Sequence, residues 1–255
     1  AAKLADNFNG NLIYRSEDIY KQRCKDEYQK ASMEDLRWLG IKWDEGPDIN
    51  GPHNPYLQSE RTNRYRQVLK ELKLRGLAYP CSCSWKDVAE ASRAPHKSGS
   101  EHIYPGTCRP KNHQEKYIDL NRKDKINWRF RIPDKTSINF KDGHFGEQEF
   151  HTNIDFGDFI LWRHDDIPSY QLAVVVDDHD MQITEVVRGA DLLKCTARQI
   201  LLYKAMEWKI PDFYHCPLVT DSNGQRLAKR NKALSINYIR DSGKSPQSII
   251  DNFNL

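Results

Sequence analysis

The residues best suited to chemistry follow two apolar runs in the second half of the chain. Residues 172–176 (Leu-Ala-Val-Val-Val) precede two aspartates and a histidine at positions 177–179. Residues 183–187 precede Arg188 in the same way. Unbroken apolar runs are typical of strands buried on both faces of a parallel sheet, and ligands bind such sheets outside the carboxyl ends of the strands. We therefore predict a ligand site where these two strands end.

Three of the six cysteines lie in one segment, as the motif Cys81-Ser82-Cys83 and as Cys108. Two thiolates one residue apart and a third from a separate loop supply three of the four ligands of a tetrahedral zinc site. This clustering favours a metal over a disulfide framework. The alternative is three free cysteines in a loop. Candidates for the fourth ligand are His96, His102 and Tyr104, and general chemistry favours histidine.

A basic loop forms a third group, with Arg226, Lys229 and Arg230 following a turn at residues 223–224. A lysine on a loop can reach the phosphates of a nucleotide and offset the charge that develops as pyrophosphate leaves. The alternative is an ordinary basic surface loop.

The elements that must position these groups alternate between strand and helix. Apolar positions recur with the helical period between residues 60 and 75, which predicts a helix that Ser59 caps and Gly76 ends. A second helix is expected from residue 193 to residue 204, after the second apolar run. Strand, loop, strand and helix in this order are typical of a doubly wound α/β sheet.

Composition and charge narrow the class of protein. The 255 residues, 38% of them hydrophobic, suffice for one large domain or a domain with an insertion. No apolar run approaches the length of a membrane span and no signal-peptide core is present at the start, so we expect a cytoplasmic protein that does not bind membranes. The net charge of +3 decides little, but basic runs at residues 109–135 and 221–245 favour a polyanionic partner.

Five motifs, in order along nearly the whole chain, resemble the catalytic core of class I glutamyl-tRNA synthetases. Each motif is weak alone, whereas five in the right order are specific. The resemblance implies a ligase with a doubly wound, Rossmann-like parallel α/β sheet into which an α+β zinc-containing subdomain is inserted. The motifs are Arg15-Ser16-Glu17-Asp18, Trp43-Asp44-Glu45-Gly46-Pro47-Asp48, residues 55–61, residues 170–188 and Arg226-Leu227-Ala228-Lys229-Arg230.

The resemblance also implies a glutamate site. Glu17, Tyr170 and Arg188 match the positions that hold glutamate in that family. Arg188 can pair with a carboxylate through two hydrogen bonds, Glu17 can accept from the ammonium group, and the Tyr170 hydroxyl can orient the substrate. The alternatives are a structural ion pair for the two charged residues and a packed aromatic ring for Tyr170. Residues 177–179 are interpreted as shaping the site or anchoring a loop rather than as catalytic, and a Mg²⁺ role for the two aspartates is not favoured.

Lys229 matches the catalytic lysine of the family's Lys-Met-Ser-Lys-Ser loop, which contacts ATP. Here Arg226 and Ala228 replace the first lysine and the serine of that loop. ATP is accordingly expected as a substrate, together with Mg²⁺.

The cysteine pattern is similar to that of a shorter branch of the family, the glutamyl-queuosine tRNA(Asp) synthetases. In that branch the motif Cys-x-Cys…Tyr-x-x-x-Cys holds zinc, which assigns Cys81, Cys83, Tyr104 and Cys108 to a structural zinc site. Members of the branch attach glutamate to queuosine in the anticodon loop of tRNA(Asp). The resemblance therefore implies tRNA(Asp) as the partner of a monomeric enzyme.

The resemblance predicts four segments. Residues 1–76 would be the first part of the catalytic domain, 77–150 the zinc-binding insert, 151–215 the second part of the catalytic domain, and 216–255 the lysine loop and C-terminal tail. The family's His-Ile-Gly-His-like motif, whose helix start cradles ATP phosphates, is not in this sequence. Residues 1–9 look like the end of that helix, so we expect the natural protein to begin earlier.

Two competing hypotheses remain open at this stage. One is a fragment of a glutamyl-tRNA synthetase that acts on a tRNA 3′ end; the cysteine pattern and the short tail after Arg230 argue against it. The other is a non-catalytic, zinc-stabilised RNA-binding module.

Overall fold

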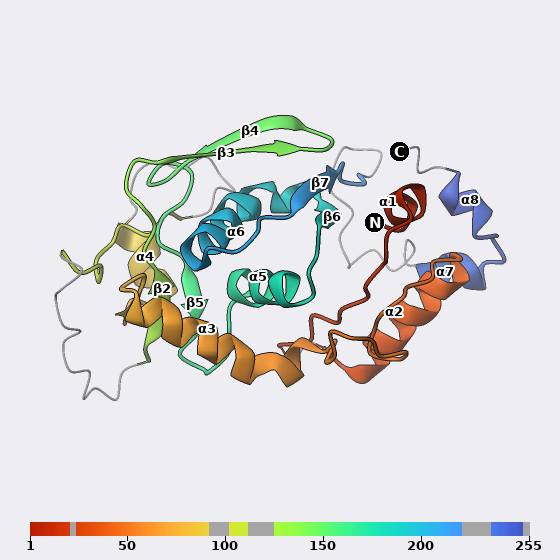
Figure 1. The fold of residues 1–255 in the computed structure, drawn as a ribbon, viewed down its shortest axis with the longest axis horizontal. Coiled ribbons are helices and arrows are strands. Elements are labelled where there is room, and N and C mark those ends of the chain that lie inside the picture. Colours follow the sequence, from red (N-terminus) through yellow and green to blue (C-terminus); the bar gives the residue numbers. More distant parts are fainter. Residues whose placement is uncertain (21–23, 92–101, 112–124, 221–235, 252–255) are drawn as a thin grey trace. The chain divides into compact units, whose positions relative to one another are not determined.

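A computed structural model of the chain describes residues 1–20, 24–91, 102–111, 125–220 and 236–251 (Figure 1). The chain divides into two compact units. Ala1–Glu60 and Pro217–Leu255 form one unit, and Arg61–Cys216 form the larger one. The larger unit contains the predicted residues Cys81, Cys83, Tyr104, Cys108, Tyr170 and Arg188, whereas Glu17 belongs to the smaller unit.

The larger unit contains a three-stranded antiparallel sheet with the order β1-β2-β5. Its strands are β1 (Ala78–Cys81), β2 (Asn127–Phe130) and β5 (Ile160–Trp162). Because Cys81 ends β1, the first zinc-ligand candidate stands on a regular, paired strand.

A second sheet is mixed and has the order β4-β3-β7-β6. Strands β3 and β4 form an antiparallel hairpin, while β3, β7 and β6 run parallel. Arg188 of β6 stands opposite His215 of β7, and Asp142 ends β3. Three neighbouring strands therefore bring these residues toward their carboxyl ends, where ligands of such sheets bind. The strands are β3 (Ser137–Asp142), β4 (Gly146–His151), β6 (Glu185–Gly189) and β7 (Asp212–Cys216).

Helices of the larger unit pack around these sheets, with α5 between α3 and α6 (Figure 1). In α3 the apolar positions of the predicted amphipathic helix are all buried, and each such side chain contributes about 1.5–3 kcal/mol of transfer free energy. The helices are α3 (Thr62–Leu74), α4 (Trp85–Ala91), α5 (Tyr170–Asp180), η2 (Ala190–Leu192) and α6 (Leu193–Met206). The 3₁₀ helix η1 (Gln58–Arg61) includes the last residues of the first segment of the smaller unit and Arg61 of the larger one.

The predicted strand at residues 172–176 is wrong, because these residues lie within helix α5. Ser169 caps the helix, its Oγ accepting a hydrogen bond from the backbone N–H of Leu172 at 3.3 Å. Since α5 packs against α3, α6 and β5, residues 172–178 are all buried. A helix that is apolar on every face loses its helical pattern and resembles a buried strand in sequence. The second predicted strand is confirmed as β6.

Helices α3 and α6 confirm the two predicted helices, with one change at a terminus. Arg61, not Ser59, is the N-cap residue of α3. Ser59 instead donates to the Asp18 carboxylate from its backbone N–H at 2.9 Å and from its hydroxyl at 2.6 Å. Gly76 follows the last turn with a φ of 70°, a conformation that glycine adopts without steric cost.

The smaller unit contains short helices around two parallel bridges, Ile13 to Glu45 and Ser16 to Leu57. Glu45 and Tyr56 are buried there and are joined by a 2.5 Å hydrogen bond from the Tyr56 hydroxyl. This contact ties together two of the family motifs. The helices are α1 (Ala2–Phe8), α2 (Asp26–Trp38), α7 (Ile236–Asp241) and α8 (Gln247–Ile250).

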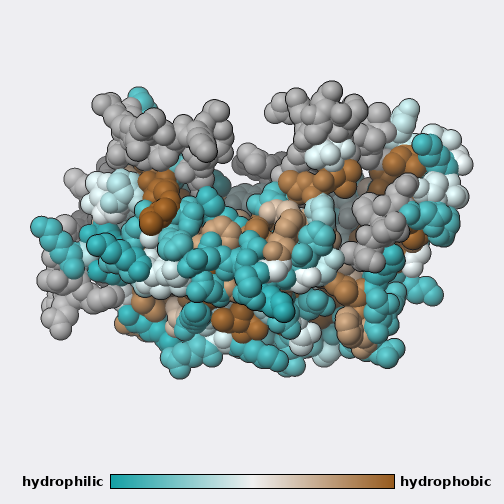
Figure 2. Space-filling view, turned by 90° about the horizontal axis from the view of Figure 1, so that it is seen from above, coloured by the Kyte–Doolittle hydropathy of each residue, from teal (hydrophilic) through white to brown (hydrophobic). Residues whose placement is uncertain are grey.

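On the face shown in Figure 2, hydrophilic residues predominate and hydrophobic ones form separate patches. Within the described residues, no helix combines the length and the apolar character that crossing a membrane requires. The four predicted segments stay a prediction; both sheets take strands from either side of residue 150.

Candidate active site and metal centre

Arg188, near the end of β6, is held by side chains from three other elements. Its Nε donates to Nε2 of His215 at 3.1 Å, and its Nη2 donates to Oγ1 of Thr196 at 2.6 Å. Nη1 donates to the Tyr170 hydroxyl at 3.5 Å. The structure therefore brings together Tyr170 and Arg188, two of the three predicted glutamate-binding residues, at the start of α5 and the end of β6.

Behind Arg188 lies a buried pair that sequence reasoning missed. His215 and Asp142 are 0% and 1% exposed, and Nδ1 of His215 lies 2.6 Å from Oδ2 of Asp142. The Asp142 carboxylate also accepts from the backbone N–H groups of His144 and Phe145. Burial alone would raise the pKa of Asp142, but these donors hold it below its usual value. Asp142 therefore stays ionised inside the protein.

The protonation state and the tautomer of His215 follow from its neighbours. Burial lowers the pKa of His215, and Arg188 lowers it further against the opposing effect of Asp142. The imidazole is neutral at pH 7, with its proton on Nδ1 where the carboxylate accepts it. Its Nε2 then carries a lone pair, which accepts the N–H of Arg188.

The remaining predicted residues of this site fall elsewhere. Glu17 belongs to the smaller unit, where its carboxylate lies 3.6 Å from Arg15, and its position opposite Tyr170 stays a prediction. Lys229 and the rest of the motif Arg226-Leu227-Ala228-Lys229-Arg230 lie outside the described residues, so their contact with ATP also stays a prediction.

Residues 177–179 of α5 anchor helices rather than face the Arg188 cluster. The Asp177 carboxylate, 0% exposed, accepts from Arg61 at 2.6 Å and from the Tyr65 hydroxyl at 2.8 Å. The His179 ring stacks on Trp208 with centroids 4.0 Å apart. These contacts join α5 to α3 and to the end of α6, and the role of residues 177–179 in shaping the site stays a prediction.

The cysteine cluster is assembled in the larger unit as the spacing predicted. The sulfur atoms of Cys81, Cys83 and Cys108 all lie within 4.8 Å of one another, and those of Cys83 and Cys108 are 3.5 Å apart. The Tyr104 hydroxyl lies 3.4 Å from the sulfur of Cys81 and 3.9 Å from that of Cys83. It accepts the backbone N–H of Cys108 at 2.7 Å. Three thiols and a phenol from two separate segments thus converge on one point.

These four donors fit a zinc ion. Tetrahedral zinc with Zn–S bonds of 2.3 Å and a Zn–O bond near 2.0 Å places neighbouring ligand atoms about 3.5–3.8 Å apart, close to the distances found. Burial opposes ionisation of Cys108, but hydrogen bonds from the Tyr104 hydroxyl and the Ser82 backbone lower the pKa of its thiol to about 7. Burial raises the pKa of Cys83 to about 12, so a metal would have to displace that proton.

Two histidines were alternatives to Tyr104 as the fourth ligand. His96 lies outside the described residues. The His102 ring packs edge-on against Trp85 with centroids 5.0 Å apart, and His102 is not among the close ligand groups of the described chain. The geometry therefore favours Tyr104, although the assignment of the fourth ligand stays a prediction.

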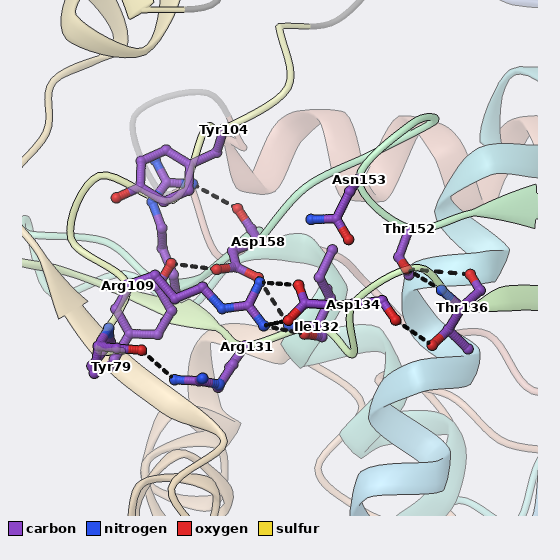
Figure 3. Close-up of polar contacts among 12 residues, drawn as sticks. Tyr79, Tyr104, Arg109, Arg131, Ile132, Asp134, Thr136, Thr152, Asn153 and Asp158 are labelled. Atoms are coloured by element: carbon purple, nitrogen blue, oxygen red, sulfur yellow. Dashed lines mark hydrogen bonds and ion pairs between the residues drawn. The ribbon is translucent and has the colours of Figure 1, made fainter. Parts of the chain in front are cut away.

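Arg129 of β2 supports the cluster from one side. It is 7% exposed, its Nε donates to the sulfur of Cys81 at 3.2 Å, and its guanidinium lies 3.8 Å from the centre of the Tyr104 ring. Its Nη1 also donates to the carbonyl oxygen of Asp158. The Asp158 carboxylate accepts from the Tyr79 hydroxyl at 2.5 Å. Figure 3 shows the Tyr104, Arg109 and Asp158 side chains close to one another. These three residues help to line a cavity of about 350 Å³.

The family is decided by comparison with known proteins. Residues 2–255 match the family described as tRNA synthetases class I (E and Q), catalytic domain. The chain belongs to this family. Its members are ligases, and the class I synthetase fold predicted from the motifs is confirmed.

Curated relatives of this synthetase chain fall into two groups. Two proteins called glutamyl-Q tRNA(Asp) synthetase, from Nitratidesulfovibrio vulgaris and Symbiobacterium thermophilum, are 45% and 44% identical to it. The matches cover 92% and 94% of this chain and 72% and 74% of those proteins. A glutamate–tRNA ligase from Sulfurihydrogenibium sp. is 38% identical over 97% of this chain and 51% of its own length.

A solved structure shows the same fold. The crystal structure of a glutamate tRNA ligase from Elizabethkingia meningosepticum in complex with its amino acid superposes with a TM-score of 0.77 at 30% identity. The match covers 90% of this synthetase chain and 47% of that protein. The chain thus spans about half the length of the solved structure.

Proposed function

We propose that this chain activates glutamate with ATP and transfers the glutamyl group to queuosine in the anticodon loop of tRNA(Asp). The observation that carries the proposal is the guanidinium of Arg188, fixed on one side by neutral partners and placed next to the Tyr170 hydroxyl. The similarity to two glutamyl-Q tRNA(Asp) synthetases supports the choice of RNA.

In the first step, Arg188 binds a carboxylate of glutamate through two parallel hydrogen bonds. Tyr170 orients the same substrate, and Glu17 accepts from its ammonium group. The α-carboxylate of glutamate attacks the α-phosphate of ATP, so that glutamyl-adenylate forms and pyrophosphate leaves. Lys229 would offset the negative charge that develops on the phosphates, and Mg²⁺ bound with ATP would supply further positive charge there. Positioning and charge stabilisation suffice for this chemistry, and no protein nucleophile is needed.

In the second step, a hydroxyl group of the modified base attacks the activated carbonyl and AMP leaves. The RNA partner is tRNA(Asp), and the basic residues of the chain neutralise its phosphates. A tRNA substrate also implies a cytoplasmic location. We take the monomer as the working form of the enzyme.

Zinc has a structural role in this proposal. Cys81, Cys83, Tyr104 and Cys108 would occupy all four positions of a tetrahedral ion, which is typical of a structural site, whereas a catalytic zinc keeps one position open. Such an ion would fix the segment of residues 104–108 against the end of β1.

The first test is glutamate-dependent exchange of pyrophosphate into ATP. It uses the full-length protein as its organism encodes it, including any residues that flank this chain. We expect exchange with glutamate and not with glutamine or aspartate. Absence of glutamate-dependent exchange would exclude the enzyme and favour a non-catalytic RNA-binding module.

The second test compares tRNA(Asp) with and without queuosine as acceptors of radioactive glutamate. We expect transfer only to the queuosine-containing form. Transfer to tRNA(Glu) would instead favour a glutamate–tRNA ligase, the activity named for the relative from Sulfurihydrogenibium sp.. Equal transfer to both forms of tRNA(Asp) would exclude recognition of queuosine.

A further inference from the structure

We propose that His215, oriented by Asp142, is a positioning residue that aims Arg188 at the carboxylate of the substrate. The inference rests on the proposed function, since it deepens the role of Arg188 in holding glutamate. It adds two residues from β3 and β7 that none of the family motifs in the sequence contains.

The first argument is the geometry of the guanidinium, a planar group with five N–H donors along fixed edges. The edge formed by Nε and Nη2 is held by Nε2 of His215 and Oγ1 of Thr196, which lie 3.2 Å apart. Nη1 belongs to the other edge and points to Tyr170. The protein therefore binds one edge, and a carboxylate beside Tyr170 would meet the other edge formed by Nη1 and Nη2.

The second argument concerns charge. A carboxylate in place of His215 would pair directly with Arg188 and neutralise it, which would weaken its attraction for a substrate anion. A neutral imidazole fixes the direction of the guanidinium and leaves its positive charge for the ligand. Asp142 contacts the opposite nitrogen of the His215 ring from the one that faces Arg188. Its carboxylate accepts the Nδ1 proton and so sets the tautomer of His215.

The third argument is the rigidity of the support. Asp142, His215 and Arg188 stand on β3, β7 and β6, three neighbouring parallel strands. His215 and Thr196 are both 0% exposed. A side chain held by paired strands and buried neighbours keeps its orientation, and a catalytic site needs that precision in its binding groups.

The test uses two neutral substitutions that separate the two contacts of His215. In His215→Gln the amide lies near the former Nε2, so its oxygen can accept from Arg188 while the contact with Asp142 is lost. In His215→Asn the amide lies near the former Nδ1, so it can donate to Asp142 while the contact with Arg188 is lost. Both variants remove the ring and both leave the site without a titratable histidine.

Steady-state pyrophosphate exchange gives separate KM values for glutamate and ATP. Loss of a hydrogen bond to a charged group predicts a KM for glutamate about tenfold or more above wild type in His215→Asn. In His215→Gln we expect a KM for glutamate within about threefold of wild type, and in both variants an unchanged KM for ATP. His151→Gln is the matched control, because the exposed His151 side chain on β4 lies beside Glu149 and Asp155 rather than on Arg188.

The outcomes distinguish this inference from the proposed function. Suppose that the wild-type protein is active but that His215→Gln and His215→Asn have the same KM for glutamate as each other. His215 is then only structural, and the inference is overturned while the proposed function stands. Calorimetric titration with glutamate alone gives the same comparison without turnover. Wild-type protein that neither exchanges pyrophosphate nor binds glutamate would overturn both. Thermal unfolding of the two variants checks that a difference in KM does not follow a difference in stability.

Discussion

The cysteine cluster and the Arg188 cluster each have a neighbouring side chain whose charge is opposite to that of the ligand-binding groups. The two clusters differ in how close that side chain lies. At the cysteine cluster, Arg129 touches the sulfur of Cys81 directly. At the other cluster, the Asp142 carboxylate is separated from Arg188 by neutral His215. Three thiolates would carry more negative charge than one Zn²⁺ neutralises, so an adjacent cation would stabilise the site if it held zinc. A single guanidinium in contact with a carboxylate would have little charge left for a substrate. A permanent ligand and an exchangeable one thus need different surroundings.

The largest expected effect is loss of the metal. In Cys108→Ser we expect zinc in the purified protein to fall from about one per chain to near zero, because an unperturbed hydroxyl is a poor substitute for a thiolate ligand. The unfolding temperature should fall as well, since metal binding contributes to folding free energy. Cys195→Ser is the matched control, because Cys195 is a free cysteine of α6 outside the cluster. Metal analysis by mass spectrometry checks both, and equal zinc in the two variants would contradict the site.

The next effect concerns Arg188. Arg188→Lys keeps the charge but loses the planar fork that contacts His215 and Thr196 and would bind a carboxylate. Loss of a hydrogen-bonded charged contact costs about 2–5 kcal/mol, so we expect kcat/KM for glutamate to fall by about 30-fold or more. The KM for ATP should not change. A variant that keeps its activity within a few-fold would show that charge alone, without geometry, holds the substrate.

A smaller effect is expected at the fourth zinc ligand. Tyr104→Phe removes the hydroxyl but keeps the ring on which Arg129 stacks. If the hydroxyl binds zinc, competition with a chelator should show an affinity about 10–100-fold lower, the range known for weakened metal sites. His102→Ala tests the alternative ligand and should leave the affinity unchanged. The reverse result would assign the fourth position to His102.

The smallest effect is a dependence on pH. The pKa of His215 lies below its ordinary value of 6.5, mainly because burial disfavours the charged form; Arg188 lowers it further, and Asp142 and Asp191 oppose these effects. Its contribution to stability is therefore complete above about pH 6.5 and is lost as the pH falls through the lowered pKa. Protonation also removes the lone pair that accepts from Arg188. We expect the KM for glutamate to rise roughly two- to tenfold on acidification in the wild type, and a flatter profile in His215→Gln.

Prediction from sequence succeeded where residue type alone carries the chemistry. The close spacing of Cys81, Cys83 and Cys108 indicated the cluster that the fold assembles. It failed where local pattern is ambiguous, because residues 172–176 are apolar on every side and form a helix instead of a strand. It also missed Arg129, whose contact with Cys81 spans 48 positions of the chain. An arginine in a strand is common and gives no sign that its partner is a sulfur.

By itself, the sequence determined which groups can bind a ligand. The residue types indicate the chemistry of the thiols, the Tyr104 phenol and the Arg188 guanidinium, and the motifs indicate the family. Only the tertiary structure decided what stands behind them. His215 is 27 positions from Arg188, and Asp142 is 73 positions from His215. Neighbouring parallel strands bring these distant residues into contact, because pairing between strands, rather than spacing along the chain, sets which side chains meet at the end of the sheet.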